Sequence, residues 1–231
     1  FRLSLFQHIG PYTSITGDGY VGQDTTVYGK AKPVKTYVGP EPRMSMRYAF
    51  GKDNSFKAGA GLNYQYIHLV SSSNSTLPTD IWVQSSQYVK PQMALQYSVG
   101  YFRNFKNNMF EFSAEAYFKH LWNQIEYAES YVGDLNVDQE RGYVFGKGKA
   151  YGLELFLKKR TGKFNGWIGY TLSRSDRKFA DINGGKTFPA KYDRTNDLTI
   201  NIAYDFNKEW TIATTFVYAT GNAITPVTGI G

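Results

Sequence analysis

Three histidines are the residues of this sequence best suited to bind a metal ion or to move a proton near neutral pH. They are His8, His68 and His120, and long stretches of chain separate each from the next. Zinc sites commonly take ligands that lie only a few residues apart. The spacing therefore favours surface or interfacial roles, and the lack of cysteine excludes thiolate ligands and disulfides. We expect neither a metal site nor another cofactor.

Two glycine-rich acidic stretches, GDGYVGQD (17–24) and DINGG (181–185), are similar to fragments of calcium-binding loops. Neither contains the full series of oxygen ligands found in an EF-hand. Because glycine, asparagine and aspartate are also typical of turns, we favour a turn at both places. Serines are frequent, but none stands in a nucleophile-elbow motif. We predict no catalytic residue and no enzyme, although a hydrolase site assembled from separate strands would leave no local motif.

The segment YDRTND (192–197) alternates acidic and basic side chains. We favour a role in ordering the loop where the next strand begins, with Asp193 and Arg194 paired to neighbours. The segment closes a basic stretch of chain. The basic residues of this stretch are Arg174, Arg177, Lys178, Lys186, Lys191 and Arg194. Side chains of this kind bind phosphate and carboxylate groups.

The elements that must position these residues are β-strands. The stretch DLTINIAYDF (197–206) alternates apolar and polar residues almost without error, and a strand sends successive side chains to opposite faces. Similar alternation predicts nine strands in all. Their ranges are 1–8, 43–50, 56–66, 93–103, 110–119, 151–158, 164–173, 197–206 and 210–218.

The connections between the predicted strands alternate in length. Short polar connections occupy 51–54, 104–108, 160–163 and 206–209, whereas long ones occupy roughly 9–41, 70–91, 128–148 and 175–195. In an antiparallel meander, this places the tight turns on one rim and the long loops on the other. Outer-membrane β-barrels segregate their loops in this way, and soluble sandwiches rarely do.

Each face of the predicted sheet then has a partner in a barrel, because the apolar face contacts lipid and the polar face lines the lumen. Aromatic residues near the strand ends suit the girdles of a membrane barrel. The lipid-facing girdle candidates are Tyr48, Phe56, Tyr64, Tyr66, Tyr97, Tyr101, Phe110, Phe118, Tyr151, Tyr170, Tyr204, Trp210 and Tyr218. The candidates for the lumen or a plug are Arg43, Arg47, Lys57, Glu111, Glu115, Glu154, Lys158, Asn201 and Asp205.

Composition agrees with a membrane barrel. The 231 residues include 19 Tyr, 16 Phe and 4 Trp, and no apolar run is long enough for a transmembrane helix. Alternation keeps the mean hydropathy of barrel strands low, and here the mean hydropathy is −0.44. The net charge of +7 permits contact with acidic lipids or lipopolysaccharide, and we expect no nucleic-acid partner. Both ends of the chain look cut, so we expect an internal section of a wider barrel.

The C-terminal part carries a family resemblance. The stretches GKAYGLELFLKKRTGKFNGWIGYTLSRSDRKF (148–179), FPAKYDRTNDL (188–198) and FVYATGNAIT (216–225) resemble the TonB-dependent outer-membrane receptors of Bacteroidetes-type bacteria, as does 63–105 upstream. The resemblance implies an all-β, antiparallel up-and-down transmembrane barrel, with 1–231 as one partial barrel domain of a probable 22-stranded wall. It further implies a separate plug inside the lumen and a TonB complex that acts through the missing N-terminal part.

The resemblance implies active import of a scarce nutrient across the outer membrane of a Gram-negative bacterium. Siderophore, cobalamin, oligosaccharide and peptide stay open as cargo, and a surface lipoprotein lid is a possible further partner. The basic stretch near 174–194 would then meet lipopolysaccharide phosphates or an acidic ligand. A passive porin or hydrophobic-compound channel is the alternative, followed by a soluble β-sandwich adhesin.

Overall fold

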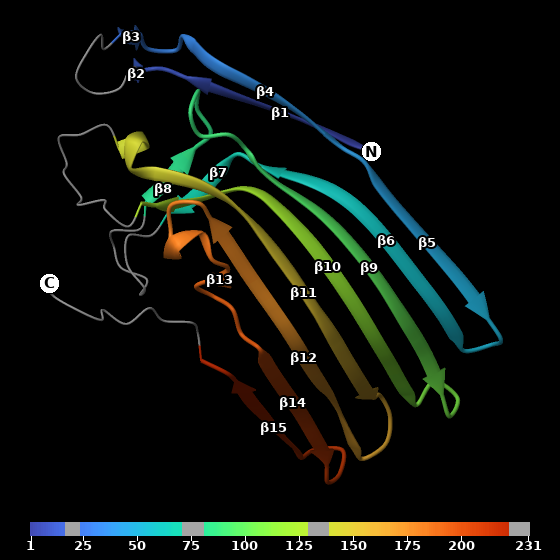
Figure 1. Ribbon diagram of the computed structural model, residues 1–231. Helices are drawn as coiled ribbons and strands as arrows, with labels where there is room; N and C mark the ends of the chain where they lie inside the picture. The colour runs from blue at the N-terminus through green and yellow to red at the C-terminus, as the bar shows by residue number, and fades with distance from the viewer. Residues whose placement is uncertain (17–23, 71–80, 129–138, 222–231) are drawn as a thin grey trace, which may run out of the picture.

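The protein is an antiparallel β structure in the computed structural model, which describes residues 1–16, 24–70, 81–128 and 139–221 (Figure 1). Within these residues, the main sheet has nine strands in the order β15-β14-β12-β11-β10-β9-β6-β5, with β13 beside β12. The pairs β1-β4, β2-β3 and β7-β8 form separate two-stranded sheets. The bounds are β1 Arg2–Ile9, β2 Tyr12–Thr16, β3 Asp24–Tyr28, β4 Pro33–Glu41, β5 Arg43–Phe50, β6 Asn54–Gln65, β7 Ile67–Val70, β8 Ile81–Gln84, β9 Gln92–Phe105, β10 Phe110–Tyr127, η1 Gln139–Gly142, β11 Tyr143–Lys159, β12 Phe164–Phe179, η2 Asn183–Gly185, β13 Phe188–Pro189, β14 Asn196–Asp205 and β15 Thr211–Ala219.

All the predicted strands are found among the described residues. Eight of them follow one another along the path of the main sheet, and the opening one is β1, which pairs with β4. Each long strand pairs with its neighbours in sequence, as in an up-and-down meander. The sheet curves as a single layer in Figure 1.

The four predicted tight turns are confirmed at 51–54, 104–108, 160–163 and 206–209, and they lie at one end of the sheet in Figure 1. Left-handed backbone at Gly51, Gly162 and the run Lys106–Asn108 allows the first three of these reversals. The longer connections leave the opposite end of the sheet. The segregation of loop length inferred from the sequence is therefore a feature of the structure.

The long connections contain more strand than the alternation predicted. The range 9–41 includes the β2-β3 hairpin and β4, so its assignment as a loop is wrong. β10 continues to Tyr127 and β11 begins at Tyr143, so these two strands extend well beyond their predicted ends. The reason is chemical: beyond the predicted ranges the residues no longer alternate apolar with polar, although the backbone ladder continues.

Many large apolar side chains of the main sheet are exposed, including Met44 at 79% and Phe216 at 55%. No second sheet covers them within the described residues, so a β-sandwich is not the fold. A small buried cluster lies instead at the end with the long connections. It joins Val70 and Val83 of the β7-β8 hairpin to Val89, Ile125 and Tyr143. This cluster fixes the hairpin to the ends of β10 and β11.

Candidate lumen face, lipid face and rim

One face of the main sheet, here called the polar face, carries all nine lumen candidates. Residues paired across an antiparallel ladder point to the same face. The ladder places Arg47 opposite Lys57, Lys57 opposite Gly100, and Glu115 opposite both Gly100 and Glu154. The same register and the alternation along each strand link Arg43, Arg47, Lys57, Glu111, Glu115, Glu154, Lys158, Asn201 and Asp205. Trp167 of β12 also lies on this face, between Lys158 and Asn201.

Charge is unevenly distributed on the polar face. The basic side chains of β5 and β6 lie on one side, whereas Glu115 and Glu154 lie directly opposite each other on β10 and β11. Two carboxylates in that position repel each other. Nearer the tight turns, Glu111 forms an ion pair with Arg160 at 2.5 Å. The Lys57 ammonium lies 4.0 Å from the centre of the Phe102 ring, so part of the basic side also makes a cation–π contact.

The opposite face, here called the apolar face, carries a continuous band of apolar side chains. On β11 the band consists of Tyr151, Leu153, Leu155 and Leu157. Lys149 lies just before it on the strand and Lys159 just after it. The nine residues from Tyr151 to Lys159 span about 26 Å of strand. A tilted barrel strand needs about this length to cross the hydrocarbon layer.

The aromatic candidates are placed mainly on this apolar face. Phe118 stacks on Tyr151 with centroids 6.3 Å apart, and Phe56 contacts Tyr101 at 5.3 Å. Tyr66 departs from the prediction because it follows the end of β6 and its hydroxyl contacts Ser4 Oγ at 2.6 Å. The other candidates on the apolar face are Tyr48, Tyr64, Tyr97, Phe110, Tyr170, Tyr204 and Tyr218, with Trp210 just before β15.

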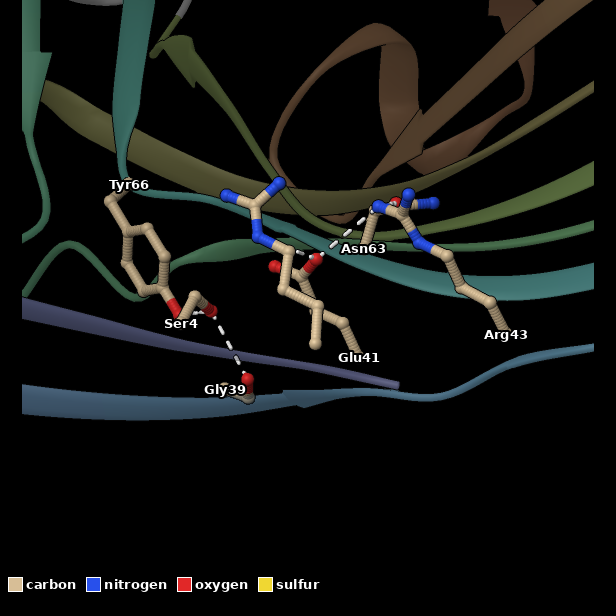
Figure 2. A network of polar contacts seen from close by, with 7 residues as sticks. Ser4, Gly39, Glu41, Arg43, Asn63 and Tyr66 are labelled. Carbon is tan, nitrogen blue, oxygen red and sulfur yellow. Dashed lines mark hydrogen bonds and ion pairs between the residues drawn. The ribbon is translucent and has the colours of Figure 1, made fainter.

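A polar network joins β1, β4, β5 and β6 where β4 ends at Glu41 (Figure 2). The Glu41 side chain is only 2% exposed, and its Oε2 lies 3.5 Å from Arg2 Nε and 3.4 Å from Arg43 Nη2. Arg43 also donates to Asn63 Oδ1 at 2.7 Å. Pro42 separates β4 from β5, since proline has no N–H to give to a ladder. The network therefore holds β1 and β4 against β6 at the point where the main ladder stops.

Next to this network, β4 and β6 are separated by side chains rather than joined by a ladder. Ser4 Oγ donates to the Gly39 carbonyl at 3.1 Å, and Tyr66 stacks on Phe6 at 5.1 Å. A cavity of about 320 Å³ opens between the strands, lined by Tyr37, Tyr64 and residues of β9 and β10. Gly39 has to be small here, since a Cβ would lie 2.4 Å from the Tyr66 hydroxyl.

The basic residues of β12 near the end with the long connections are divided between the two faces of the sheet. Arg174 and Lys178 lie on the apolar face, and Arg177 lies on the polar face. Arg174, Arg177 and Lys178 belong to β12, so their assignment to a loop is wrong: the strand continues to Phe179. Arg174 Nε donates to both carboxylate oxygens of buried Asp176, at 3.0 and 3.2 Å. Arg177 pairs with Glu126 of β10. Lys186, Lys191 and Arg194 do lie in the connection between β12 and β14.

The YDRTND segment orders its loop as expected. Asp193 Oδ1 accepts a hydrogen bond from the Ser175 backbone N–H at 2.6 Å, and the Arg194 carbonyl accepts one from Ser173 Oγ at 2.8 Å. DINGG contains the short η2 turn with left-handed backbone at Asn183, in line with turn chemistry. GDGYVGQD lies largely outside the described residues.

The three histidines occupy three different environments. His8 is buried and meets the Tyr12 ring edge-on at 4.8 Å, whereas His120 is exposed and stacks on Trp122. His68 is fully buried, its Nε2 is 3.1 Å from Ser85 Oγ, and burial lowers its pKa to about 4. The part of the chain that the structure describes contains no group of three or more potential metal ligands. In that same part, no helix has both the length and the hydropathy to cross a bilayer.

Two features at the rim were missed by the sequence reasoning. Glu41 was overlooked because a lone glutamate between prolines gives no sign of burial. Lys147 was assigned to a loop and Lys149 to no element, yet both share the alternation of Tyr151 and lie on the apolar face beyond the band. The repeat GKGKAYGLEL contained the signal that would have placed them.

The class of protein defined by this architecture is the wall of an outer-membrane type β-barrel: neighbouring strands, one apolar and one polar face, and tight turns on one rim. The family model described as "TonB dependent receptor-like, beta-barrel" matches residues 11–229. The chain belongs to this family. This confirms the resemblance and the fold class, while the Bacteroidetes type stays a prediction.

Solved structures share the fold. They include the FrpB iron transporter from Neisseria meningitidis, F3-3 variant, with TM-score 0.54 and 14% identity over 79% of this chain and 27% of that one. The FpvAI–pyocin S2 complex gives 0.53 and 13% over 83% and 24%. P. aeruginosa FpvA bound to heterologous pyoverdines gives 0.52 and 13% over 85% and 26%. The chain thus spans about a quarter of the length of these structures. None of the curated proteins compared with the chain matches it.

Proposed function

We propose that the chain is a section of the barrel wall of a TonB-dependent receptor that actively imports a scarce nutrient across the outer membrane of a Gram-negative bacterium. The observation that carries the proposal is the register of the main sheet. It collects every charged lumen candidate on one face and the apolar band on the other. The family match on residues 11–229 supports the same function.

The apolar face is the lipid contact in this proposal. Apolar side chains such as Met44 and Phe216 are exposed, and contact with lipid would remove them from water. The aromatic candidates would lie at the interfaces with the head groups. The end with the tight turns would face the periplasm and the long connections would face outward.

The polar face is the contact of the plug domain, which would come from another part of the full-length receptor. Gly59 and Gly61 leave room beside Arg43 and Lys57 for a second polar surface. Glu115 and Glu154 would be relieved of their mutual repulsion by a basic group of the plug. Pulling on the plug by the TonB complex would then open the lumen.

The cargo stays at the level of a scarce nutrient, which includes siderophores, cobalamin, oligosaccharides and peptides. Two of the similar structures are described as an iron transporter and as a receptor with bound pyoverdines, which favours testing ferric siderophores first. A surface lipoprotein lid is a further possible partner, and its co-purification would identify it.

The test is uptake of radiolabelled ferric siderophores, cobalamin and oligosaccharides by cells that carry the full-length receptor, with and without a functional TonB. Import that disappears without TonB supports the proposal. A passive channel would instead conduct ions across a planar bilayer and admit solute equally well in both strains. That outcome would replace the proposed function.

A further inference from the structure

Two lysines lie directly opposite each other at the outer end of the apolar face. The ladder between β11 and β12 pairs Lys147 with Lys178, and Lys149, two residues farther along β11, lies opposite buried Asp176. All three side chains are exposed. Like charges opposite each other on neighbouring strands are destabilising unless an anion lies between them. We call Lys147, Lys149 and Lys178 the lysine cluster.

The acidic groups nearby are already engaged. Asp176 accepts two hydrogen bonds from Arg174, and Glu126 pairs with Arg177. No ion pair within 4.0 Å involves the lysine cluster in the described part of the chain. The cluster therefore has positive charge to offer to a ligand.

A small cavity lies among these lysines. Its volume is about 180 Å³, and it is lined by all three lysines with His120, Gly148 and Thr187, and also by Asp176 and Arg177, whose side chains are paired with Arg174 and Glu126. Ammonium and hydroxyl groups at such a site suit the oxygens of a phosphate group.

The position of the cavity indicates what kind of phosphate-bearing molecule it would bind. The apolar band of β11 ends at Tyr151, and Lys149 lies about 7 Å beyond it along the strand, towards the long connections. On the other side of Lys147, β10 places Trp122 directly opposite. A phosphate held here would belong to a molecule whose apolar chains lie along the band below. A soluble anion has no apolar chains and would make no contact with that band.

We propose that the lysine cluster binds the phosphate of a phosphorylated lipid head group in the outer leaflet. The inference rests on the proposed lipid contact of the apolar face. It deepens that proposal by assigning the phosphate to Lys147, Lys149 and Lys178, whereas the loop residues Lys186, Lys191 and Arg194 are not needed.

The experiment uses the full-length receptor that contains this chain, in detergent micelles, titrated with diphosphorylated lipid A and followed by native mass spectrometry. The test variant is Lys147→Gln/Lys178→Gln. The control, Lys163→Gln/Lys208→Gln, changes the charge equally at the rim of tight turns. We expect the affinity for lipid A to fall at least about tenfold in the test variant and to stay unchanged in the control.

Dephosphorylated lipid A, titrated into the unmodified receptor, tests the same point without a substitution and should bind weakly. Equal binding by the test variant, or equal losses in both variants, would overturn the inference. Inorganic phosphate that binds the lysine cluster as tightly as lipid A would also overturn it, in favour of a soluble anion. A receptor that fails to insert into lipid vesicles at all would instead contradict the proposed function.

Discussion

At the scale of the residue, the ion pairs around Glu41 have the clearest consequence for stability. Glu41 is the buried member of a group whose two arginines are largely solvated, with Arg2 65% and Arg43 53% exposed. Removing a partner from an ion pair is most costly when the group left behind is buried and charged. The arginines should therefore matter more for stability than the carboxylate does.

This asymmetry gives a prediction for the full-length receptor. Glu41→Gln leaves two hydrated arginines and should lower the free energy of unfolding by about 1 kcal/mol. Arg2→Gln/Arg43→Gln leaves a buried carboxylate and should cost about 3 kcal/mol or more. Urea unfolding in lipid vesicles measures both. Adding Glu41→Gln to the double variant should restore most of the loss, and a further loss would contradict this account.

His68 makes the β7-β8 hairpin sensitive to acid. Its pKa falls from 6.5 to about 4 on folding because the ring is buried. The unfolded hairpin therefore binds more protons between these values. The stabilisation is complete above pH 6.5 and is lost as the pH falls towards 4.

We expect the hairpin to open more readily by about 2 kcal/mol at pH 5 than at pH 7. Hydrogen exchange in β7 and β8 of the full-length receptor, corrected for intrinsic rates, measures this difference. His68→Gln removes the titrating group and should abolish the pH dependence. A dependence that survives the substitution would assign the effect to another residue.

At the scale of the element, β11 shows how one strand serves two environments. Leu155 lies in the middle of the apolar band, whereas Thr171 lies on the polar face of β12, opposite Glu154. In a membrane, Leu155→Lys should destabilise the barrel by about 2–4 kcal/mol. Thr171→Lys should be nearly neutral, because the new ammonium faces a carboxylate.

The measurement is the amount of folded full-length receptor in the outer membrane, together with its resistance to urea. Loss confined to Leu155→Lys supports the lipid face. If Thr171→Lys were the more damaging of the two substitutions, the assignment of the faces would have to be reversed.

The alternation of residues was sufficient to predict the nine strands and their faces because the band must stay apolar on one side. Outside the band that requirement ends, so the upper parts of β10, β11 and β12 do not alternate apolar with polar residues, and only the glycine–lysine repeat of β11 carried a signal. β4 was missed for a related reason: PVKTYVGPE contains two prolines and a glycine, and its pairing with β1 depends on distant residues. Tyr66 was misplaced because its alternation continued beyond the end of β6.

At the scale of the whole molecule, the two rims should lie on opposite sides of the membrane. Asp181 is exposed beyond β12, and Lys208 is exposed in the tight turn between β14 and β15. Single cysteines at these positions, in a cysteine-free background of the full-length receptor, should react differently with an impermeant maleimide. In intact cells Asp181→Cys should be labelled and Lys208→Cys protected. Both should be labelled once the cells are broken, and the reverse pattern would invert the orientation.

The meander also separates two kinds of evolutionary change: changes in strand pairing and changes in the length of the long connections. Register between neighbouring strands is set by the ladders and by tight turns such as 104–108. A longer segment inserted at the other rim shifts no pairing and turns no side chain to the wrong face. The wall can therefore stay constant through descent while the outward segments are exchanged, lengthened or shortened. Segments that contact a different cargo could therefore evolve without any change in the strands that fold in the membrane.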